Sequence, residues 1–230
     1  MSESTKPADS RRLYQQVADQ VRDLIAAGQF VPGSRLPAER DFAQQLGVSR
    51  PSLREGLIAL EIEGSVEIRM GSGVYVCAGP AGVQAPTRPL GESPSELMQA
   101  RAAVEGTVAA LAAARMDDKA LGTLEGTLEA MRTEVAAGRK PLEQDRLFHV
   151  TIAAQTGNSV LVRLVADLFD ERHAPISARL QSRFESPGTW AAAIEEHVTI
   201  LKGLVAADPI LAQAAMRLHL EASRERWIEA

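Results

Sequence analysis

Apolar residues recur every three or four positions through the first 64 residues, a spacing that puts them on one face of an α-helix. The pattern predicts a first helix that ends at Gly28, a second helix over 37–46, and a third that begins after Ser49 and ends near Gly64. Gly47 can take the left-handed conformation that ends a helix, and the Ser49 hydroxyl can cap the next one. The short turn between these two helices predicts a helix-turn-helix.

A β-hairpin is expected directly after these helices. Apolar and polar residues alternate over 66–69 and 74–77, on either side of Gly71-Ser72-Gly73. Three helices followed by a hairpin predict a winged helix-turn-helix domain over 11–78. Residues 1–10 hold no apolar stretch and are expected to be disordered.

The clearest break in the pattern lies at 79–94, where we place a linker between two domains. Proline and glycine at this density interrupt a chain and do not continue a helix. A long surface loop within one domain is the alternative. The interrupting residues are Gly79, Pro80, Gly82, Pro86, Pro89, Gly91 and Pro94.

Helical spacing returns over 95–230 and predicts an antiparallel bundle with short loops. Two apolar stripes, over 97–111 and 121–135, mark its first two helices. The fold class is therefore mainly α, with an N-terminal winged helix-turn-helix and a C-terminal all-helical bundle. Further helices are expected at about 141–155, 158–172, 174–184, 189–206 and 209–228.

Composition narrows the classes of function. The chain has 230 residues, of which 45% are apolar, and a net charge of −5. A single cysteine, Cys77, excludes a disulfide framework and a zinc site built from cysteines. No signal-peptide pattern is present, and no apolar run approaches the roughly 20 residues that span a bilayer. We therefore expect a cytoplasmic protein with no membrane partner.

The third helix carries the main candidates for DNA contacts. Neither 1–78 nor 79–230 is basic overall, so DNA binding must rest on a few placed arginines. Arg50 and Arg54 are four residues apart and project from one face, and an arginine can bind the two acceptors of guanine. Arg40 could reach the same groove or its phosphates. The spacing leaves open that these are ordinary surface arginines, paired with Glu39, Asp41 and Glu55.

Three smaller residues complete this candidate surface for double-stranded DNA. Ser49 and Ser52 have hydroxyl groups suited to phosphate contacts. Gly71, at the tip of the hairpin, would allow close approach to the DNA backbone or minor groove.

Residues 11–77 resemble the DNA-binding domain of the GntR superfamily. The motifs that carry the resemblance are LPAER, GVSRPSLRE, LEIEG and GSGVYV. In the FadR-type branch, arginines of these motifs contact DNA, which implies that role for Arg40, Arg50 and Arg54. The glycine of the wing corresponds to Gly71, and Arg35 is a weaker candidate.

Ionisable residues lie on the inward stripes of four predicted bundle helices. Arg101 lies on the first stripe, and the others are Asp145, His149, His197 and His219. A buried charge is expensive unless it is paired or binds a metal. Each histidine alone could be a satisfied core or surface residue, and we interpret His173 as surface.

Together, the carboxylate and three imidazoles predict a site for a divalent transition metal. Asp145 and His149, at i and i+4, can both reach one ion. Zinc is the ion we expect first, with nickel, iron or manganese as alternatives. A divalent ion, one carboxylate, neutral histidines and Arg101 give a charge of about +2, which should attract a small carboxylate.

The bundle resembles the FCD effector domain of FadR-type regulators over 94–228. The segments that carry it include RAAVEGTVAALAA, DRLFHVTIAAQTGNSVLVRL and AMRLHLEASRER. The resemblance places effector contacts at Arg101 and Asn158, although Asn158 could simply cap a helix; Trp190 and Arg224 are weaker candidates. It places the metal ligands at Asp145, His149, His197 and His219.

Within that family the chain looks most similar to regulators of hexuronate and aldonate use. This implies a sugar-acid effector, with lactate or another small hydroxy acid or dicarboxylic acid as the alternative. It also implies a homodimer that binds a palindromic operator, acting as a repressor. A metal-dependent enzyme is the rival class, but the stripes hold no obvious extra base and the chain no nucleophile motif. We expect no enzymatic activity.

Overall fold

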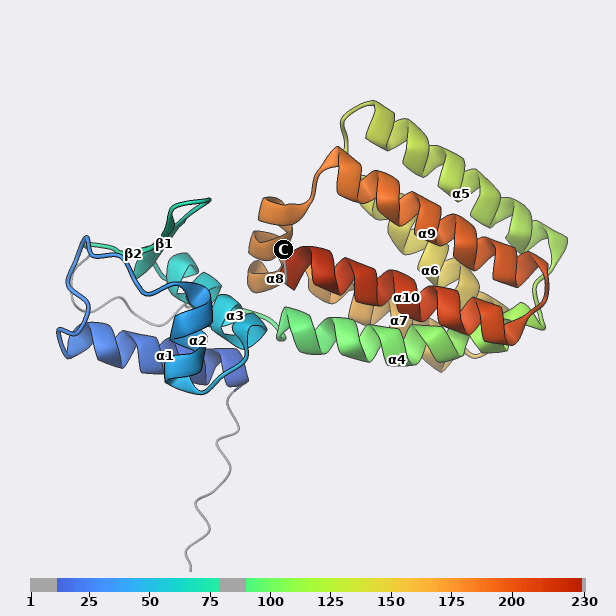
Figure 1. The fold of residues 1–230 in the computed structure, drawn as a ribbon. Helices are drawn as coiled ribbons and strands as arrows, with labels where there is room; N and C mark the ends of the chain where they lie inside the picture. The colour runs from blue at the N-terminus through green and yellow to red at the C-terminus, as the bar shows by residue number, and fades with distance from the viewer. Residues whose placement is uncertain (1–11, 79–89, 229–230) are drawn as a thin grey trace, which may run out of the picture. The chain divides into compact units, whose positions relative to one another are not determined.

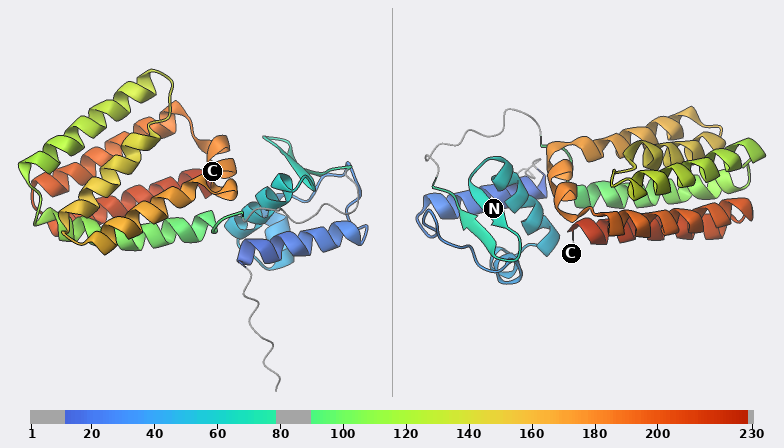
Figure 2. Two further views of the ribbon diagram at one scale, coloured as in Figure 1. Left: turned by 180° about the vertical axis from the view of Figure 1, so that it is seen from behind. Right: turned by 90° about the horizontal axis from the view of Figure 1, so that it is seen from above.

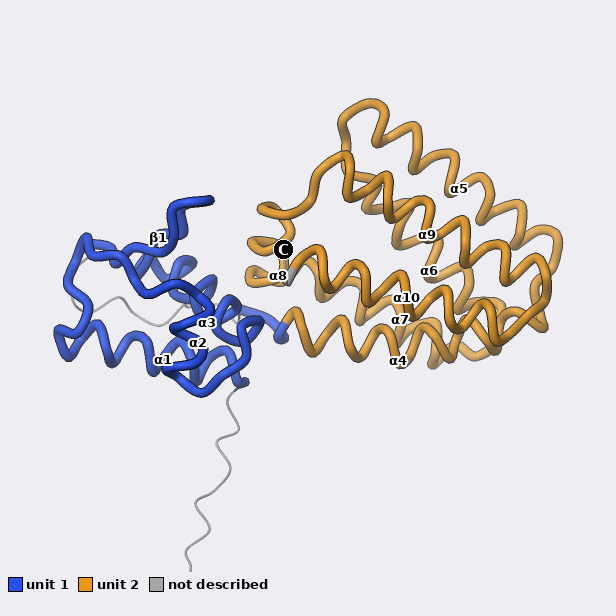
Figure 3. The backbone as a smooth tube through the Cα atoms, viewed as in Figure 1, with its two compact units in different colours: residues 1–93 blue, residues 94–230 orange. Residues whose placement is uncertain are grey.

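A computed structural model describes residues 12–78 and 90–228, in two compact units that divide at Ser93 and Pro94 (Figure 3). The expected disorder of residues 1–10 and most of the expected linker lie outside the described residues. Residues 90–93, the end of that linker, belong to the first unit. There, Leu90 is buried, and the Gly91 carbonyl accepts a hydrogen bond from the Tyr14 hydroxyl at 3.0 Å.

The first unit has the predicted three helices and hairpin (Figure 1). The hairpin is antiparallel, with Val66 opposite Val76. Its buried core joins the helices to the wing and includes Tyr14, Val17, Phe42, Leu53, Leu57, Leu60, Val66 and Val74. The elements are α1 (Leu13–Ala26), α2 (Glu39–Leu46), α3 (Arg50–Ile62), β1 (Val66–Arg69) and β2 (Gly73–Val76).

Both predicted caps of the helix-turn-helix are confirmed. Gly47 ends α2 in the left-handed conformation with φ 68°, and the Ser49 hydroxyl accepts a hydrogen bond from the Ser52 amide at 3.1 Å. The second helix begins at Glu39, two residues later than expected. Gly56 lets α3 approach α1 closely, since a Cβ there would lie 2.8 Å from Val17 Cγ1.

The second unit is the predicted helical bundle, in which neighbouring helices run back and forth along a common direction (Figure 2). Helix α4 packs along α10 and also contacts α6 and α7, whereas α5 packs against α6 and α9. The helices are α4 (Pro94–Ala113), α5 (Asp118–Ala136), α6 (Leu142–Gln155), α7 (Ser159–Asp170), the 3-10 turn η1 (Glu171–His173), α8 (Pro175–Phe184), α9 (Pro187–Val205) and α10 (Pro209–Ile228).

A close contact fixes the turn between α9 and α10. A Cβ on Gly203 would lie 2.7 Å from the Ala212 backbone nitrogen, so only glycine allows the two helices to approach in this way. This contact brings inward residues of α9 and α10 together with those of α6. Among the described residues, no helix is long and apolar enough to cross a membrane.

Candidate functional site

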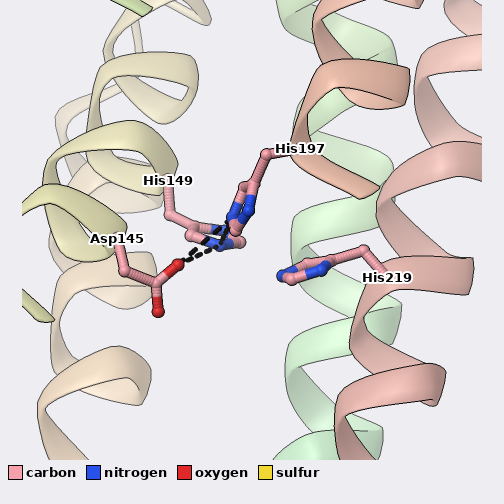
Figure 4. Close-up of side chains that lie close together, drawn as sticks. All are labelled: Asp145, His149, His197 and His219. Carbon is pink, nitrogen blue, oxygen red and sulfur yellow. Dashed lines mark hydrogen bonds and ion pairs between the residues drawn. The ribbon is translucent and has the colours of Figure 1, made fainter. Parts of the chain in front are cut away.

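The four predicted metal ligands converge inside the second unit (Figure 4). Asp145 and His149 come from α6, His197 from α9 and His219 from α10, and all four are buried. Each residue offers one ligand atom, and these atoms lie within 4.8 Å of one another. The inward stripes seen in the sequence therefore meet at one point.

The Nε2 atoms of the imidazoles face one oxygen of Asp145. His197 Nε2 lies 3.2 Å from Asp145 Oδ1 and 3.3 Å from His149 Nε2. His149 Nε2 lies 3.6 Å from the same oxygen. The His219 ring lies beside these groups, with its centroid 4.3 Å from that of His197.

The other nitrogen of each imidazole is held by an acceptor outside the cluster. His149 Nδ1 lies 2.5 Å from Glu105 Oε2, and His197 Nδ1 lies 2.7 Å from the Ala193 carbonyl oxygen. His219 Nδ1 lies 2.8 Å from Glu196 Oε2. An acceptor at Nδ1 favours the proton there and leaves the Nε2 lone pair for a metal, as in many metal sites.

The pKa shifts favour a neutral His219 and a charged Asp145, whereas the pKa of His149, which burial alone would lower, is raised by Glu105 and Asp145. Burial and the nearby His197 lower the pKa of His219 to about 3, so this imidazole is neutral near pH 7. Burial alone would raise the pKa of Asp145, but His149, His197 and Arg172 hold it well below its usual value. A neutral imidazole and an ionised carboxylate are the forms that bind metal.

A divalent transition metal fits this donor set. Asp145 Oδ1 is buried and accepts no hydrogen bond, although imidazole nitrogens surround it. An ion between these atoms would satisfy the oxygen and the Nε2 lone pairs together. One carboxylate and three imidazoles suit zinc, nickel, iron or manganese.

A small, partly open cavity adjoins the cluster. Its wall includes two residues of the cluster, Asp145 and His219, and three arginines, Arg101, Arg172 and Arg226. Trp190, a weaker candidate from the sequence, also lies on this wall. The cavity therefore places hydrogen-bond donors next to the predicted metal position.

Arg101 is buried on the wall of the cavity with one donor to spare. Its Nε donates to Glu105 Oε1 at 2.6 Å, while its Nη2 has no hydrogen-bond partner among the residues that the structure describes. Its guanidinium carbon lies 4.9 Å from the centroid of the Phe169 ring. Because a buried, unsatisfied donor is costly, an acceptor from a ligand would stabilise Nη2.

Asn158 and Arg224 do not line this cavity. Asn158 is exposed, and its Oδ1 accepts hydrogen bonds from the amides of Val160 and Leu161, which is the helix-capping role that the sequence left open. Arg224 donates to Glu221 at 2.9 Å. His173 is not part of the metal cluster either.

Sequence reasoning missed the residues that support the cluster. Glu105 had a signal, because it lies four residues after Arg101 on the same helix. Glu196 directly precedes His197 and also has Arg226 as a partner. Arg172, which donates to Asp145, lies in the 3-10 turn after α7, where helical spacing gives no guide.

In the first unit, the DNA candidates differ in their surroundings. Arg40 and Arg50 are exposed, and Gly71 lies in the hairpin turn with φ 70°. Arg54 is more buried and donates to Glu39 at 2.8 Å, the pairing that the sequence had left open.

Two hydroxyls of this surface are bonded to each other. Ser49 Oγ lies 2.7 Å from Ser52 Oγ, so both sit at the N-terminus of α3. The Arg35 side chain packs against Gly73, at the position a Cβ would occupy.

Comparison with known proteins adds to this geometry. Residues 13–76 match the model of the bacterial regulatory proteins of the gntR family, and residues 96–222 match that of the FCD domain. The chain belongs to the GntR family. Its winged helix-turn-helix is the DNA-binding domain of that family, and its bundle is an FCD domain.

Relatives in this family are transcription regulators. The Exu regulon transcriptional regulator of Escherichia coli strain K12 is 36% identical over 226 residues, which cover 95% of this chain and 84% of that protein. The Uxu operon transcriptional regulator of the same strain is 34% identical over 227 residues, covering 96% and 88%. This GntR-family chain is therefore a transcription regulator and not an enzyme.

The fold is also shared with a solved structure of Escherichia coli McbR/YncC. That structure has a TM-score of 0.52 and 21% sequence identity, and the match covers 93% of this chain and 95% of that one. At this identity, the similarity concerns the fold alone.

Proposed function

We propose that this GntR-family regulator is a homodimeric, metal-dependent repressor that releases its operator when a small carboxylate binds the bundle. The observation that carries the proposal is the buried cluster of one carboxylate and three imidazoles beside a cavity lined by Arg101. The effector we favour is a sugar acid, a hexuronate or an aldonate. That choice rests on the sequence resemblance to regulators of hexuronate use and on the Exu and Uxu relatives.

A bound divalent metal would make the charge beside the cavity more favourable for an anion. Four ion pairs at the cluster and beside the cavity cancel one another in charge. A divalent ion held by Asp145 and neutral imidazoles adds a charge of about +2, which attracts a carboxylate in a partly buried site. The cations are Arg101, Lys140, Arg172 and Arg226; the anions are Glu105, Asp145, Glu185 and Glu196.

In this proposal the metal, Arg101 and Trp190 each contact a different part of the effector. The metal supplies Lewis acidity and an open position for a carboxylate oxygen. Arg101 Nη2, which lacks a partner, would donate to the effector carboxylate. Trp190 offers an apolar ring to the carbon chain of the effector.

For DNA, we propose that the N-terminus of α3 enters the major groove. Arg50 is exposed at its first turn, and Arg40 is exposed on the preceding helix. Two copies of the winged domain would bind two half-sites of a palindrome. The effector would shift the dimer toward a state with lower operator affinity. The size of this shift is set by the difference between the effector's affinities for the two states.

The proposal is tested with purified full-length protein and a palindromic site selected from random DNA. Metal-loaded and chelator-treated protein are heated with hexuronates, aldonates, lactate and dicarboxylates. We expect a sugar acid to raise the melting temperature of the loaded protein only, with a shift that grows with concentration, and to lower operator affinity. Stable metal binding with no ligand effect on DNA affinity would instead indicate a purely structural metal.

A further inference from the structure

Arg172 joins the predicted metal ligand Asp145 to the far wall of the cavity. It lies in η1, and only 2% of its surface is exposed. Its Nη1 donates to Asp145 Oδ2 at 2.7 Å, and its Nη2 donates to Glu185 Oε1 at 3.0 Å. One guanidinium therefore binds two carboxylates, one from α6 and one from the residue that follows α8.

The two carboxylate oxygens of Asp145 therefore have different neighbours. Oδ2 accepts the Arg172 hydrogen bond, whereas Oδ1 faces the imidazole nitrogens of His149 and His197. A carboxylate that is free to rotate could offer either oxygen, or both. The bond from Arg172 leaves Oδ1 as the one available oxygen.

Arg172 is itself held in place from several sides. Its guanidinium carbon lies 4.9 Å from the centroid of the Phe169 ring, 5.6 Å from that of Trp190 and 5.5 Å from that of Trp227. Its partner Glu185 is buried too, and its second oxygen lies 2.8 Å from Lys140 Nζ. Arg172 is thus part of a fixed chain of ion pairs and not a mobile surface charge.

We propose that Arg172 is a positioning residue of the metal centre, which binds Asp145 Oδ2 and so presents Oδ1 to the ion as a single oxygen ligand. The inference rests on the metal centre proposed above. The planar fork of arginine is needed because it reaches Asp145 and Glu185 at once. A lysine has one compact ammonium group in place of that fork and cannot hold both carboxylates in this geometry.

The test compares Arg172→Gln and Arg172→Lys with the wild-type protein. Zinc affinity is measured by competition with a chelator, and the visible spectrum of the cobalt-substituted protein reports the ligands and their geometry. Loss of a group that orients a metal ligand typically lowers metal affinity about 10–100-fold. We expect a loss in that range for Arg172→Gln, a smaller loss for Arg172→Lys, and an altered cobalt spectrum in both.

Arg146 offers a matched control on the same helix. It follows Asp145 directly and forms a similar two-point pair with Asp170, at 2.7 and 2.9 Å, but on the exposed side of α6. Arg146→Gln removes the same chemical group and one ion pair without touching the cluster. We expect wild-type zinc affinity and a wild-type cobalt spectrum for this variant.

Each outcome decides between a positioning role and a merely structural one. Thermal unfolding without metal shows which variants are folded, and a structural role would lower the melting temperature but leave zinc affinity in the folded protein unchanged. If folded Arg172→Gln has wild-type zinc affinity and a wild-type cobalt spectrum, the inference is overturned. If Arg172→Gln does not fold, wild-type zinc affinity and a wild-type cobalt spectrum in Arg172→Lys overturn it instead. A wild-type protein that binds no stoichiometric metal overturns the proposed metal centre and this inference together.

Discussion

Glu105 connects His149 of the buried cluster to the cavity residue Arg101. One carboxylate oxygen lies 2.5 Å from His149 Nδ1, and the other accepts a hydrogen bond from Arg101 Nε at 2.6 Å. Burial alone would raise the pKa of Glu105, but Arg101 and His149 lower it to about 2, so the carboxylate is ionised at neutral pH. A single anion thus contacts both a proposed metal ligand and the arginine expected to bind the effector.

Replacement of this anion should weaken both functions. In Glu105→Gln the side chain keeps its size but loses the charge that holds the His149 imidazole and the Arg101 guanidinium. We expect zinc affinity to fall about 10–100-fold in a chelator competition, because the single acceptor oxygen of glutamine cannot serve both His149 Nδ1 and Arg101 Nε, and the imidazole is then less firmly oriented. The matched control is Glu134→Gln on α5, where the carboxylate pairs with Arg139 away from the cluster. Equal zinc affinity in both variants would contradict the role of Glu105.

Arg101 should separate effector binding from metal binding. Arg101→Lys keeps the positive charge that Glu105 needs but loses the unpartnered Nη2 donor. A hydrogen bond to a charged group contributes roughly 1.5–3 kcal/mol, so we expect effector affinity to fall by about tenfold or more. Calorimetric titration of the zinc-loaded protein measures the effect, while zinc content should remain stoichiometric. Arg115→Lys serves as control, because Arg115 is exposed and its side chain donates to the Leu111 carbonyl, away from the cluster. An undiminished titration would exclude Arg101 from the effector site.

Arg50 should affect DNA affinity without affecting the bundle. Its side chain is exposed at the start of α3, the end of the recognition helix that lies nearest the bases in this fold. If Arg50 donates two hydrogen bonds to the two acceptors of a guanine, Arg50→Ala should make the free energy of operator binding less favourable by about 1–3 kcal/mol. Fluorescence anisotropy at constant salt measures this, since salt alone changes such affinities strongly. The effector-induced rise in melting temperature should be unchanged, and Arg132→Ala on α5 should bind operator like the wild type. A loss of the same size for unrelated DNA would assign Arg50 to the phosphates.

The convergence of Asp145 and the three histidines could be predicted from the sequence because these residues follow helical spacing. Asp145 and His149 share a stripe at i and i+4, and His197 and His219 lie on the inward stripes of their own helices. Stripes that face one core must meet, so the pattern was enough to bring the four residues together. The helices and the hairpin could likewise be predicted from residue spacing and helix caps, as the Ser49 cap illustrates.

Periodicity could not predict the residues that hold the cluster. Arg172 lies in a 3-10 turn and Glu185 follows the end of α8, so neither belongs to a stripe. The contacts of Arg172 with Asp145 and with Glu185 depend on how α7 and α8 are joined, which is a tertiary feature. Asn158 shows the opposite case: the residue type suited an effector contact, but the local need of α7 for a cap accounts for its side chain.

Two glycines in helices should respond in opposite directions to substitution by alanine. Gly56 in α3 leaves no room, since a Cβ would lie 2.8 Å from Val17 Cγ1 and 3.2 Å from the Tyr14 carbonyl oxygen. Val17 is stiff and fully packed, so the gain in helix propensity is outweighed by overpacking, which typically costs about 1–3 kcal/mol. Gly126 in α5 has no atom within 4 Å of the added Cβ, and alanine there should stabilise the protein by roughly 0.5–1 kcal/mol. Urea unfolding of the full chain, followed for each unit separately, measures both changes. A Gly56→Ala variant as stable as the wild type would mean that α1 moves away from α3 without loss of packing.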